Sequence, residues 1–243
     1  WEWWSNKKTC PKCNWRWQIT HTTQSIFWTI QQTITCDKCA WTWESFENIC
    51  SICNWEKRRT IKKEIRTSGI GIHSGLISEI VFKPAPPDTG IIFVKRTTEK
   101  SVIIPSSIKN VIDTENQVTL SAEERKIQTI EHLLSALSGL NISNCIIEVF
   151  NREIPVMDGS AYPFVEAIKE AGIVEQNENC QVIRIPHPIW VTEGDKYLVV
   201  LPSDKLEFNF HISYKHFLLH NESIYIDCLT PELYEKEISR ART

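Results

Sequence analysis

The chain has 243 residues, which is long enough to bury a sizeable hydrophobic core in one or two domains. Its formal net charge of −3 gives no general reason to expect a nucleic-acid or anionic-membrane partner. No apolar run approaches the roughly 20 residues that a membrane span needs, and no basic-then-apolar leader opens the chain. We therefore expect a cytoplasmic protein without a membrane span.

Residues 1–60 differ in composition from the rest of the chain. Six of the nine Cys and nine of the ten Trp lie in the first 55 residues, and all eight Gly lie at or after Gly69. A C-x-x-C pair occurs three times there, each with a Trp two residues later: Cys10 and Cys13, Cys36 and Cys39, Cys50 and Cys53. Two such pairs can supply four thiolates to one structural zinc ion, with one pair left over. The segment is interpreted as a possible zinc ribbon or a non-native stretch. A redox role is less favoured, because no βαβ pattern surrounds the pairs.

Basic side chains follow this segment, and we interpret them as a solvated linker: Lys57, Arg58, Arg59, Lys62 and Lys63. From residue 61 the chain has an α+β pattern. Residues 67–75 form a glycine-punctuated loop that has neither the Walker lysine nor the dinucleotide-binding spacing. Alternation and β-branched residues predict strands at 78–83, 90–95, 101–104, 118–121 and 145–150. A helix over 161–171 ends at Gly172.

An amphipathic helix is predicted after the fourth of these strands. Apolar residues recur at helical spacing from Ile130 to Leu137, Thr129 is a candidate N-cap, and Gly139 ends the run. Its first turn carries Glu131 and His132 side by side. Such a His can bind a metal ion while the Glu takes a proton from metal-bound water. A solvated Glu next to a packed or exposed His is the alternative reading.

A second unit is predicted to begin at Gln181. Strands are expected at 181–185, 189–192, 196–201, 206–213 and 223–227, with a hairpin turn at Gly194 and Asp195. Thr230 and Pro231 read as the cap and first residue of a helix over 231–243. A unit that ends in its first helix has no partner for that helix's apolar face, so we expect this domain to be incomplete. Sheets and helices without strict βαβ alternation predict the α+β class, with two-layer sheet/helix sandwiches.

Four motifs in this order carry a family resemblance: GIGIHSG at 69–75, TIEHL at 129–133, EIPVMDGSA at 153–161 and ISRART at 238–243. Together they resemble the UDP-3-O-acyl-N-acetylglucosamine deacetylases, zinc enzymes that remove an N-acetyl group in the committed step of lipid A biosynthesis. The resemblance covers roughly residues 61–243. It implies two similar α+β domains with the active site between them, at 61–178 and, incomplete, at 179–243. Residues 1–60 have no counterpart in the family.

The resemblance also implies roles for individual residues. His132 would bind Zn²⁺, Glu131 would be the general base, and Thr243 would lie at the oxyanion that forms from the acetamide. Lys196 matches a lysine that faces the nucleotide-sugar, and Tyr214 stands where the family has a Phe against the uracil. Without the resemblance, Lys196 reads as a surface lysine beside a hairpin turn and Tyr214 as a half-buried strand aromatic.

The family's other two zinc ligands and its general acid lie downstream of the last motif. The other His residues of this chain are read as structural or surface residues. We therefore expect the 243 residues alone to be inactive toward the UDP-linked acylated amino sugar. The alternative function is a zinc-ribbon interaction or nucleic-acid module fused to a nucleotide-sugar-binding remnant that does not catalyse.

Overall fold

The computed structural model describes residues 24–25, 28–29, 57–96, 100–180, 185–203, 206–214 and 221–242. The described residues divide into two compact units. The smaller contains two pairs of strands, β1 (Gln24–Ser25) with β2 (Trp28–Thr29) and β13 (Ile189–Glu193) with β14 (Lys196–Val200). The larger contains all other elements. No helix in the described part of the chain is long and apolar enough to cross a membrane.

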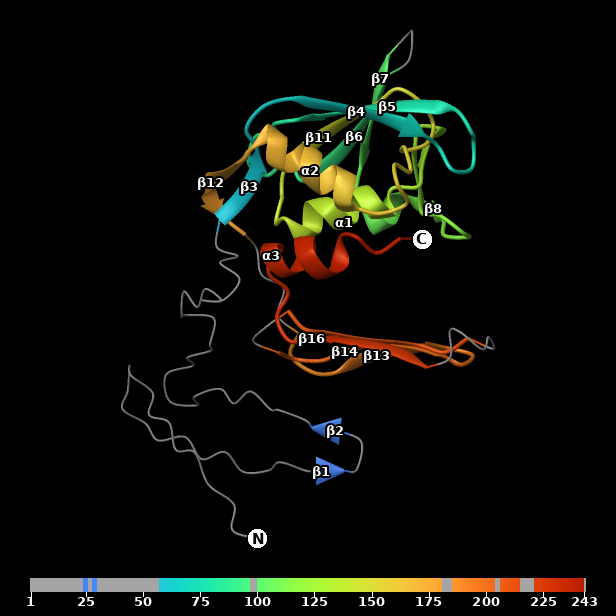
Figure 1. The fold of residues 1–243 in the computed structure, drawn as a ribbon, viewed down its shortest axis with the longest axis vertical. Coiled ribbons are helices and arrows are strands. Elements are labelled where there is room, and N and C mark those ends of the chain that lie inside the picture. The colour runs from blue at the N-terminus through green and yellow to red at the C-terminus, as the bar shows by residue number, and fades with distance from the viewer. Residues whose placement is uncertain are drawn as a thin grey trace. The chain divides into compact units, whose positions relative to one another are not determined.

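A five-stranded sheet forms the centre of the larger unit. Its strand order is β4-β5-β11-β6-β7, and β11 runs parallel to β6 and antiparallel to β5. These strands span Ile65–Ile70 (β4), Ile77–Lys83 (β5), Ile91–Arg96 (β6), Ser101–Pro105 (β7) and Cys145–Val149 (β11). Helices α1 (Glu131–Gly139) and α2 (Tyr162–Ala171) lie on the same face of this sheet (Figure 1). The α+β prediction is therefore confirmed.

The hydrophobic core fills the space between this sheet and the two helices. Ile147 of β11 pairs with Phe82 on one side and Phe93 on the other, and all three are fully buried. The rings of Phe82 and Phe164 of α2 meet edge to face, with their centroids 6.4 Å apart, an arrangement that aromatic pairs prefer. Leu133 and Leu137 are buried on the apolar stripe of α1.

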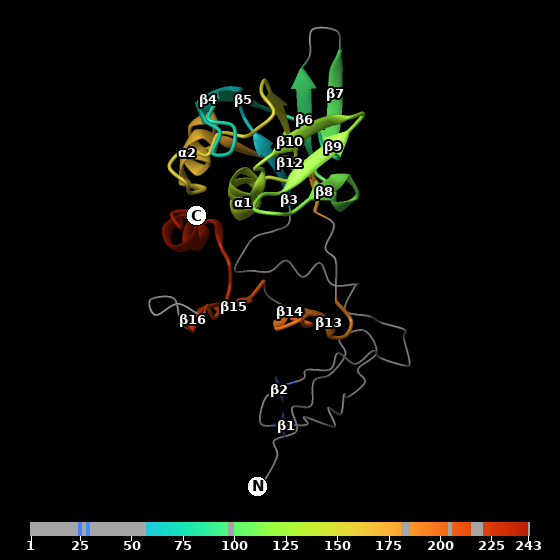
Figure 2. The same ribbon diagram turned by 90° about the vertical axis from the view of Figure 1, so that its right-hand side faces the viewer.

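A small second sheet lies alongside α1 (Figure 2). It has the order β10-β9-β8 and contains Val111–Asp113 (β8), Thr119–Ala122 (β9) and Arg125–Gln128 (β10). A 3₁₀ turn, η2 (Ile108–Asn110), precedes β8. Since β10 ends only three residues before α1 begins, this sheet helps to set the position of the start of the helix.

The prediction of a solvated basic linker is wrong for its first part. Lys57–Ile61 forms strand β3, which pairs antiparallel with β12 (Ile173–Asn179). Ile61 and Thr60 are buried, while the guanidinium of Arg59 forms an ion pair with Glu175 at 2.9 Å. The predicted glycine loop is also shorter than expected, because β4 takes residues 65–70 and the turn begins at Gly71. In both places, pairing with a distant strand decides the conformation.

The last elements of the larger unit are a hairpin and a short helical segment. Strands β15 (Phe208–Ile212) and β16 (Glu222–Ile226) pair antiparallel. Helix α3 (Pro231–Leu233) starts as predicted, with the Thr230 side chain accepting a hydrogen bond from Leu233 N, and continues as a π-helical turn, η3 (Tyr234–Ile238). The expectation that this helix has no partner is wrong, because Tyr234 is buried against α1.

Candidate active site

The Glu131–His132 pair lies in the first turn of α1, as the sequence predicts. Thr129, however, does not cap the helix. The capping position is Ile130, which makes no side-chain capping bond, and Thr129 has a left-handed φ of 59°. A β-branched residue in this region is strained and needs support from its surroundings. The Thr129 hydroxyl lies 3.0 Å from Gln117 Oε1 and 3.1 Å from Glu153 Oε1, so its hydrogen bonds are to distant side chains.

The two oxygens of the Glu131 carboxylate have different surroundings. Oε1 accepts a hydrogen bond from the backbone N–H of Val118, which precedes β9. Oε2 is buried and has no hydrogen-bond partner among the residues that the structure describes. A buried carboxylate oxygen without a donor is costly, and such groups in native proteins call for an explanation by an ion, a water molecule or a reaction. Glu131 is therefore anchored through one oxygen and has the other available.

Glu153 joins this helix start to the loop of the first motif. It is 1% exposed, and its two oxygens accept from the backbone N–H groups of His73 at 2.9 Å and Ser74 at 2.8 Å. A Cβ on Gly71 would lie 2.3 Å from Glu153 Oε2, so only glycine fits beside this carboxylate. Burial alone would raise the pKa of Glu153, but the donors from His73, Ser74 and Thr129 outweigh it and hold the pKa below its usual value.

Backbone hydrogen bonds secure the same segment on both sides. Glu153 forms a parallel bridge with Gln128, with Gln128 N to Arg152 O and Ile154 N to Gln128 O both at 3.0 Å. Three residues later, Val156 N donates to Ile70 O of β4 at 2.9 Å. The third motif therefore lies between the first and second motifs and contacts both.

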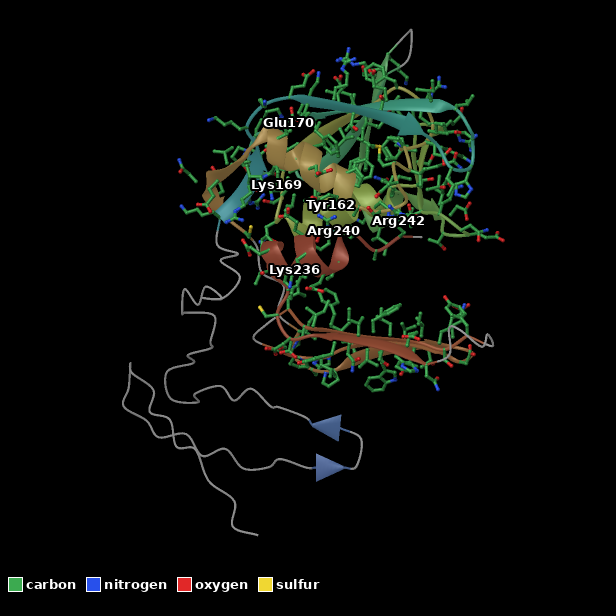
Figure 3. The ribbon with its side chains drawn as sticks, viewed as in Figure 1. Tyr162, Lys169, Glu170, Lys236, Arg240 and Arg242 are labelled. Carbon is green, nitrogen blue, oxygen red and sulfur yellow. The ribbon has the colours of Figure 1, made fainter. Side chains whose placement is uncertain are left out.

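The fourth motif contacts the far end of the same segment. Asp158 accepts from Ser160 N and Oγ in the turn before α2, and its Oδ2 lies 3.4 Å from Arg242. The guanidinium of Arg240 lies 3.7 Å from the centre of the Tyr162 ring (Figure 3). All four motifs of the resemblance thus meet along residues 153–162, although they are far apart in the sequence.

The remaining predicted site residues are either exposed on other elements or lie outside the described residues. Lys196 is exposed at the start of β14, opposite Glu193, and belongs to the smaller unit. Tyr214 follows β15 and is 57% exposed, so it is not the half-buried strand aromatic of the alternative reading. Thr243 and the six N-terminal cysteines, Cys10, Cys13, Cys36, Cys39, Cys50 and Cys53, lie outside the described residues.

The side chains at the start of α1 provide part of a zinc site. The imidazole of His132 can serve as one zinc ligand, and the buried Oε2 of Glu131 can serve as the proton acceptor. Catalytic zinc sites use three protein ligands, and in the described part of the chain no three His, Cys, Asp or Glu side chains gather into such a group. Sequence reasoning did not single out Glu153 or Gln117. The position of Glu153 inside a recognised motif was the one signal that could have found it.

The fold and the site together define an α+β protein with a carboxylate–imidazole pair in the first turn of a helix packed on the central sheet. A model of the UDP-3-O-acyl N-acetylglycosamine deacetylase (LpxC) family matches residues 58–243. The chain belongs to this family, which confirms the resemblance drawn from the four motifs.

Curated relatives named UDP-3-O-acyl-N-acetylglucosamine deacetylase agree with the family match. The chain is 42% identical to that of Leptospira biflexa over 187 residues, which is 76% of this chain and 62% of the relative. It is 43% identical to that of Saccharophagus degradans and 40% identical to that of Coxiella burnetii, each over 189 residues, 77% of this chain and 62% of the relative. The chain therefore spans 62% of the length of these relatives.

Proposed function

We propose that this chain carries the catalytic base and one metal ligand of a zinc-dependent hydrolase. The reaction removes the N-acetyl group from UDP-3-O-acyl-N-acetylglucosamine. The observation that carries this proposal is the buried, unpartnered Oε2 of Glu131 beside His132 at the start of α1. The names of the relatives support the substrate, a UDP-linked acylated amino sugar. We propose a cytoplasmic location, and no nucleic-acid partner is expected.

Glu131 performs the proton transfer in this proposal. The Val118 N–H holds Oε1, which leaves Oε2 to accept a proton from a water molecule as its oxygen attacks the acetamide carbonyl carbon. The C–N bond then breaks as the sugar nitrogen takes a proton from the general acid that the family has downstream of the last motif, and acetate and the free sugar amine are the products. Because the carboxylate oxygen is already desolvated, little reorganisation is needed when the proton moves.

His132 is the residue that would hold the zinc ion. When bound, zinc would lower the pKa of its water toward about 7 and polarise the carbonyl. Thr243 would donate to the oxyanion, Lys196 would face the nucleotide-sugar, and Tyr214 would lie against the uracil. We keep the division into domains at 61–178 and 179–243 as part of this proposal.

The experiment uses the product of the complete native gene and compares Glu131→Ala with His132→Ala. We expect His132→Ala to lower both zinc content and turnover, since the metal loses a ligand. Glu131→Ala should keep its zinc but lose about 10²–10⁴-fold in rate with little change in substrate affinity. Both residues lie off the buried stripe of α1, so alanine, the best helix former, should be tolerated. Zinc loss in Glu131→Ala, with metal and activity intact in His132→Ala, would reverse these assignments.

A second measurement tests the 243 residues by themselves. Catalytic zinc sites use three protein ligands, and no three His, Cys, Asp or Glu side chains gather into a metal-binding group among the described residues, so we expect no deacetylation above a His132→Ala control. Turnover well above that control would show that these residues hold a complete metal site.

A further inference from the structure

Two consecutive residues before β9 contact the start of α1. The side chain of Gln117 lies 3.0 Å from the Thr129 hydroxyl. The backbone N–H of the next residue, Val118, donates to Glu131 Oε1. Both residues are half-buried, and both precede β9, which begins at Thr119 in the small sheet beside α1 (Figure 2). The direction of the Val118 N–H therefore depends on these contacts rather than on strand pairing.

The hydroxyl of Thr129 has one proton and two acceptors beside it. Its oxygen lies 3.0 Å from Gln117 Oε1 and 3.1 Å from Glu153 Oε1. A threonine hydroxyl has a single proton to donate, so it cannot form a full hydrogen bond to both oxygens. The carboxylate is the stronger acceptor, because hydrogen bonds to an ionised group are roughly twice as strong as neutral ones. With the proton directed at Glu153, the oxygens of Gln117 and Thr129 would face each other with no proton between them.

The amide of Gln117 removes this conflict if it turns about its last side-chain bond. Its two ends have nearly the same shape, so a half-turn places Nε2 where Oε1 stands, and Nε2 then donates to the Thr129 oxygen. A chain of hydrogen bonds results, from the amide through the hydroxyl to the Glu153 carboxylate, with one proton in each bond. Hydrogen bonds in such a chain polarise and strengthen one another. We call this arrangement the Gln117 relay.

We propose that Gln117 is a positioning residue for Glu131 and that it acts through the Gln117 relay. The relay holds the side chain of Gln117, and the Glu131 carboxylate holds the N–H of Val118. The peptide that joins Gln117 to Val118 thus has two attachment points on the start of α1, which fix the direction of its N–H. This inference rests on the proposed function for the role of Glu131 as the base.

The first test reads the orientation of the Gln117 amide in the 243-residue chain, and it needs no activity. The glutamine side chains are isotope-labelled, and hydrogen exchange of their amide protons is followed by NMR, with Gln117→Met identifying the signal. Thr129→Val keeps the branched shape but removes the hydroxyl. A hydrogen bond from Nε2 is worth about a 2- to 10-fold shift, so one Gln117 proton should exchange faster by about that factor in Thr129→Val. The Gln128 amide is the internal reference, since its side chain has no hydrogen bond among the described residues.

The exchange rates distinguish a donating amide from an accepting one. An equal rate for the Gln117 protons in the parent and in Thr129→Val would overturn the relay, because an amide that only accepts from Thr129 has no proton in that bond. An acceleration that Gln128 shares would also overturn it, since it would reflect general loosening of the segment.

The second test measures urea unfolding and does not depend on Thr129→Val. Gln117→Met removes the amide and should raise the unfolding equilibrium constant by about 2- to 10-fold, whereas the matched control Gln128→Met should change it by less than about 2-fold. In a Glu153→Gln background the effect of Gln117→Met should become smaller, because the relay has lost its charged end. If the amide instead competed with Glu153 for the proton, the effect would grow in that background. Equal effects of Gln117→Met and Gln128→Met in the parent would also refute the relay.

The third test connects the amide to turnover in the product of the complete gene. Since the amide shifts the equilibrium between held and released peptide by about 2- to 10-fold, Gln117→Met should lower kcat by up to that factor and no more. KM should change by less than about 2-fold and zinc content should stay the same, because the amide acts on the base.

Three results of this third test would refute the positioning role. They are an unchanged kcat, a rise in KM at constant kcat, and a kcat loss well above about 10-fold, which exceeds what one neutral hydrogen bond supplies. If the parent protein has no deacetylase activity, the proposed function fails. The exchange and unfolding tests still decide whether the Gln117 relay exists.

Discussion

Replacing Glu153 tests whether a buried carboxylate holds the start of α1 together. Its oxygens accept from His73 N at 2.9 Å, Ser74 N at 2.8 Å and the Thr129 hydroxyl at 3.1 Å. Glutamine has the same shape, but its amide group would place a donor against one of the two backbone N–H groups. Hydrogen bonds to a charged group are each worth about 1.5–3 kcal/mol, so Glu153→Gln should lower the free energy of unfolding by about 2–3 kcal/mol.

The pH dependence provides a sharper test of the same substitution. Because the folded-state pKa of Glu153 is held below its usual value, its stabilisation is complete above the pKa of the unfolded state and is lost as the pH falls through the folded-state pKa. Glutamine does not titrate. The stability difference between parent and Glu153→Gln should therefore be constant above about pH 5.5 and shrink as the pH is lowered below about 4.5.

Urea unfolding followed by far-UV circular dichroism measures both quantities. The matched control is Glu79→Gln, which removes a carboxylate from an exposed ion pair with Arg66 and should cost less than about 1 kcal/mol. A Glu153→Gln variant as stable as the control variant would refute the reasoning. A stability difference that does not change between pH 6 and pH 3 would show that the charge of Glu153 is not what stabilises this segment.

Two further predictions concern the ends of the chain. Gly139→Ala places a methyl group in the space of the Tyr234 ring and should destabilise the larger unit by about 1–3 kcal/mol, measured by urea unfolding, while Ser138→Ala on the exposed side of α1 should have almost no effect. If Gly139→Ala is as stable toward urea as Ser138→Ala, Tyr234 does not pack against Gly139. A protein of residues 1–60 should bind cobalt with tetrahedral thiolate charge-transfer bands if the C-x-x-C pairs form a zinc ribbon. A cobalt spectrum without those bands would show that they do not.

Local patterns were sufficient for the elements that form the core. The apolar spacing from Ile130 to Leu137 predicted α1, and the structure buries Leu133 and Leu137 on that stripe. The prediction of a helix over 161–171 differs from α2 by one residue at its start. The strand predicted at 78–83 also differs from β5 by one residue at its start. These elements were predictable because one buried face imposes its period on the sequence.

Elements that depend on a distant partner were not predictable in this way. Residues 57–61 have a basic composition typical of a solvated segment, yet they form β3 because β12, more than 110 residues later, supplies the pairing edge. The π-helical turn after Leu233 likewise begins at Tyr234, whose buried side chain contacts α1. In both cases the deciding hydrogen bonds or contacts come from segments that a local window does not contain.

In the candidate site, too, some features follow from the local sequence and others depend on distant parts of the chain. The sequence by itself determined the family, the helix that carries Glu131 and His132, and the four motifs in their order. Only the tertiary structure showed that Thr129 is held in a left-handed conformation by Gln117 and Glu153 rather than serving as a cap. It also showed that residues 153–162 bring the motifs together. The physical reason is that a buried carboxylate needs donors, and here they come from backbone N–H groups some 80 residues away, whose positions only the folded chain defines.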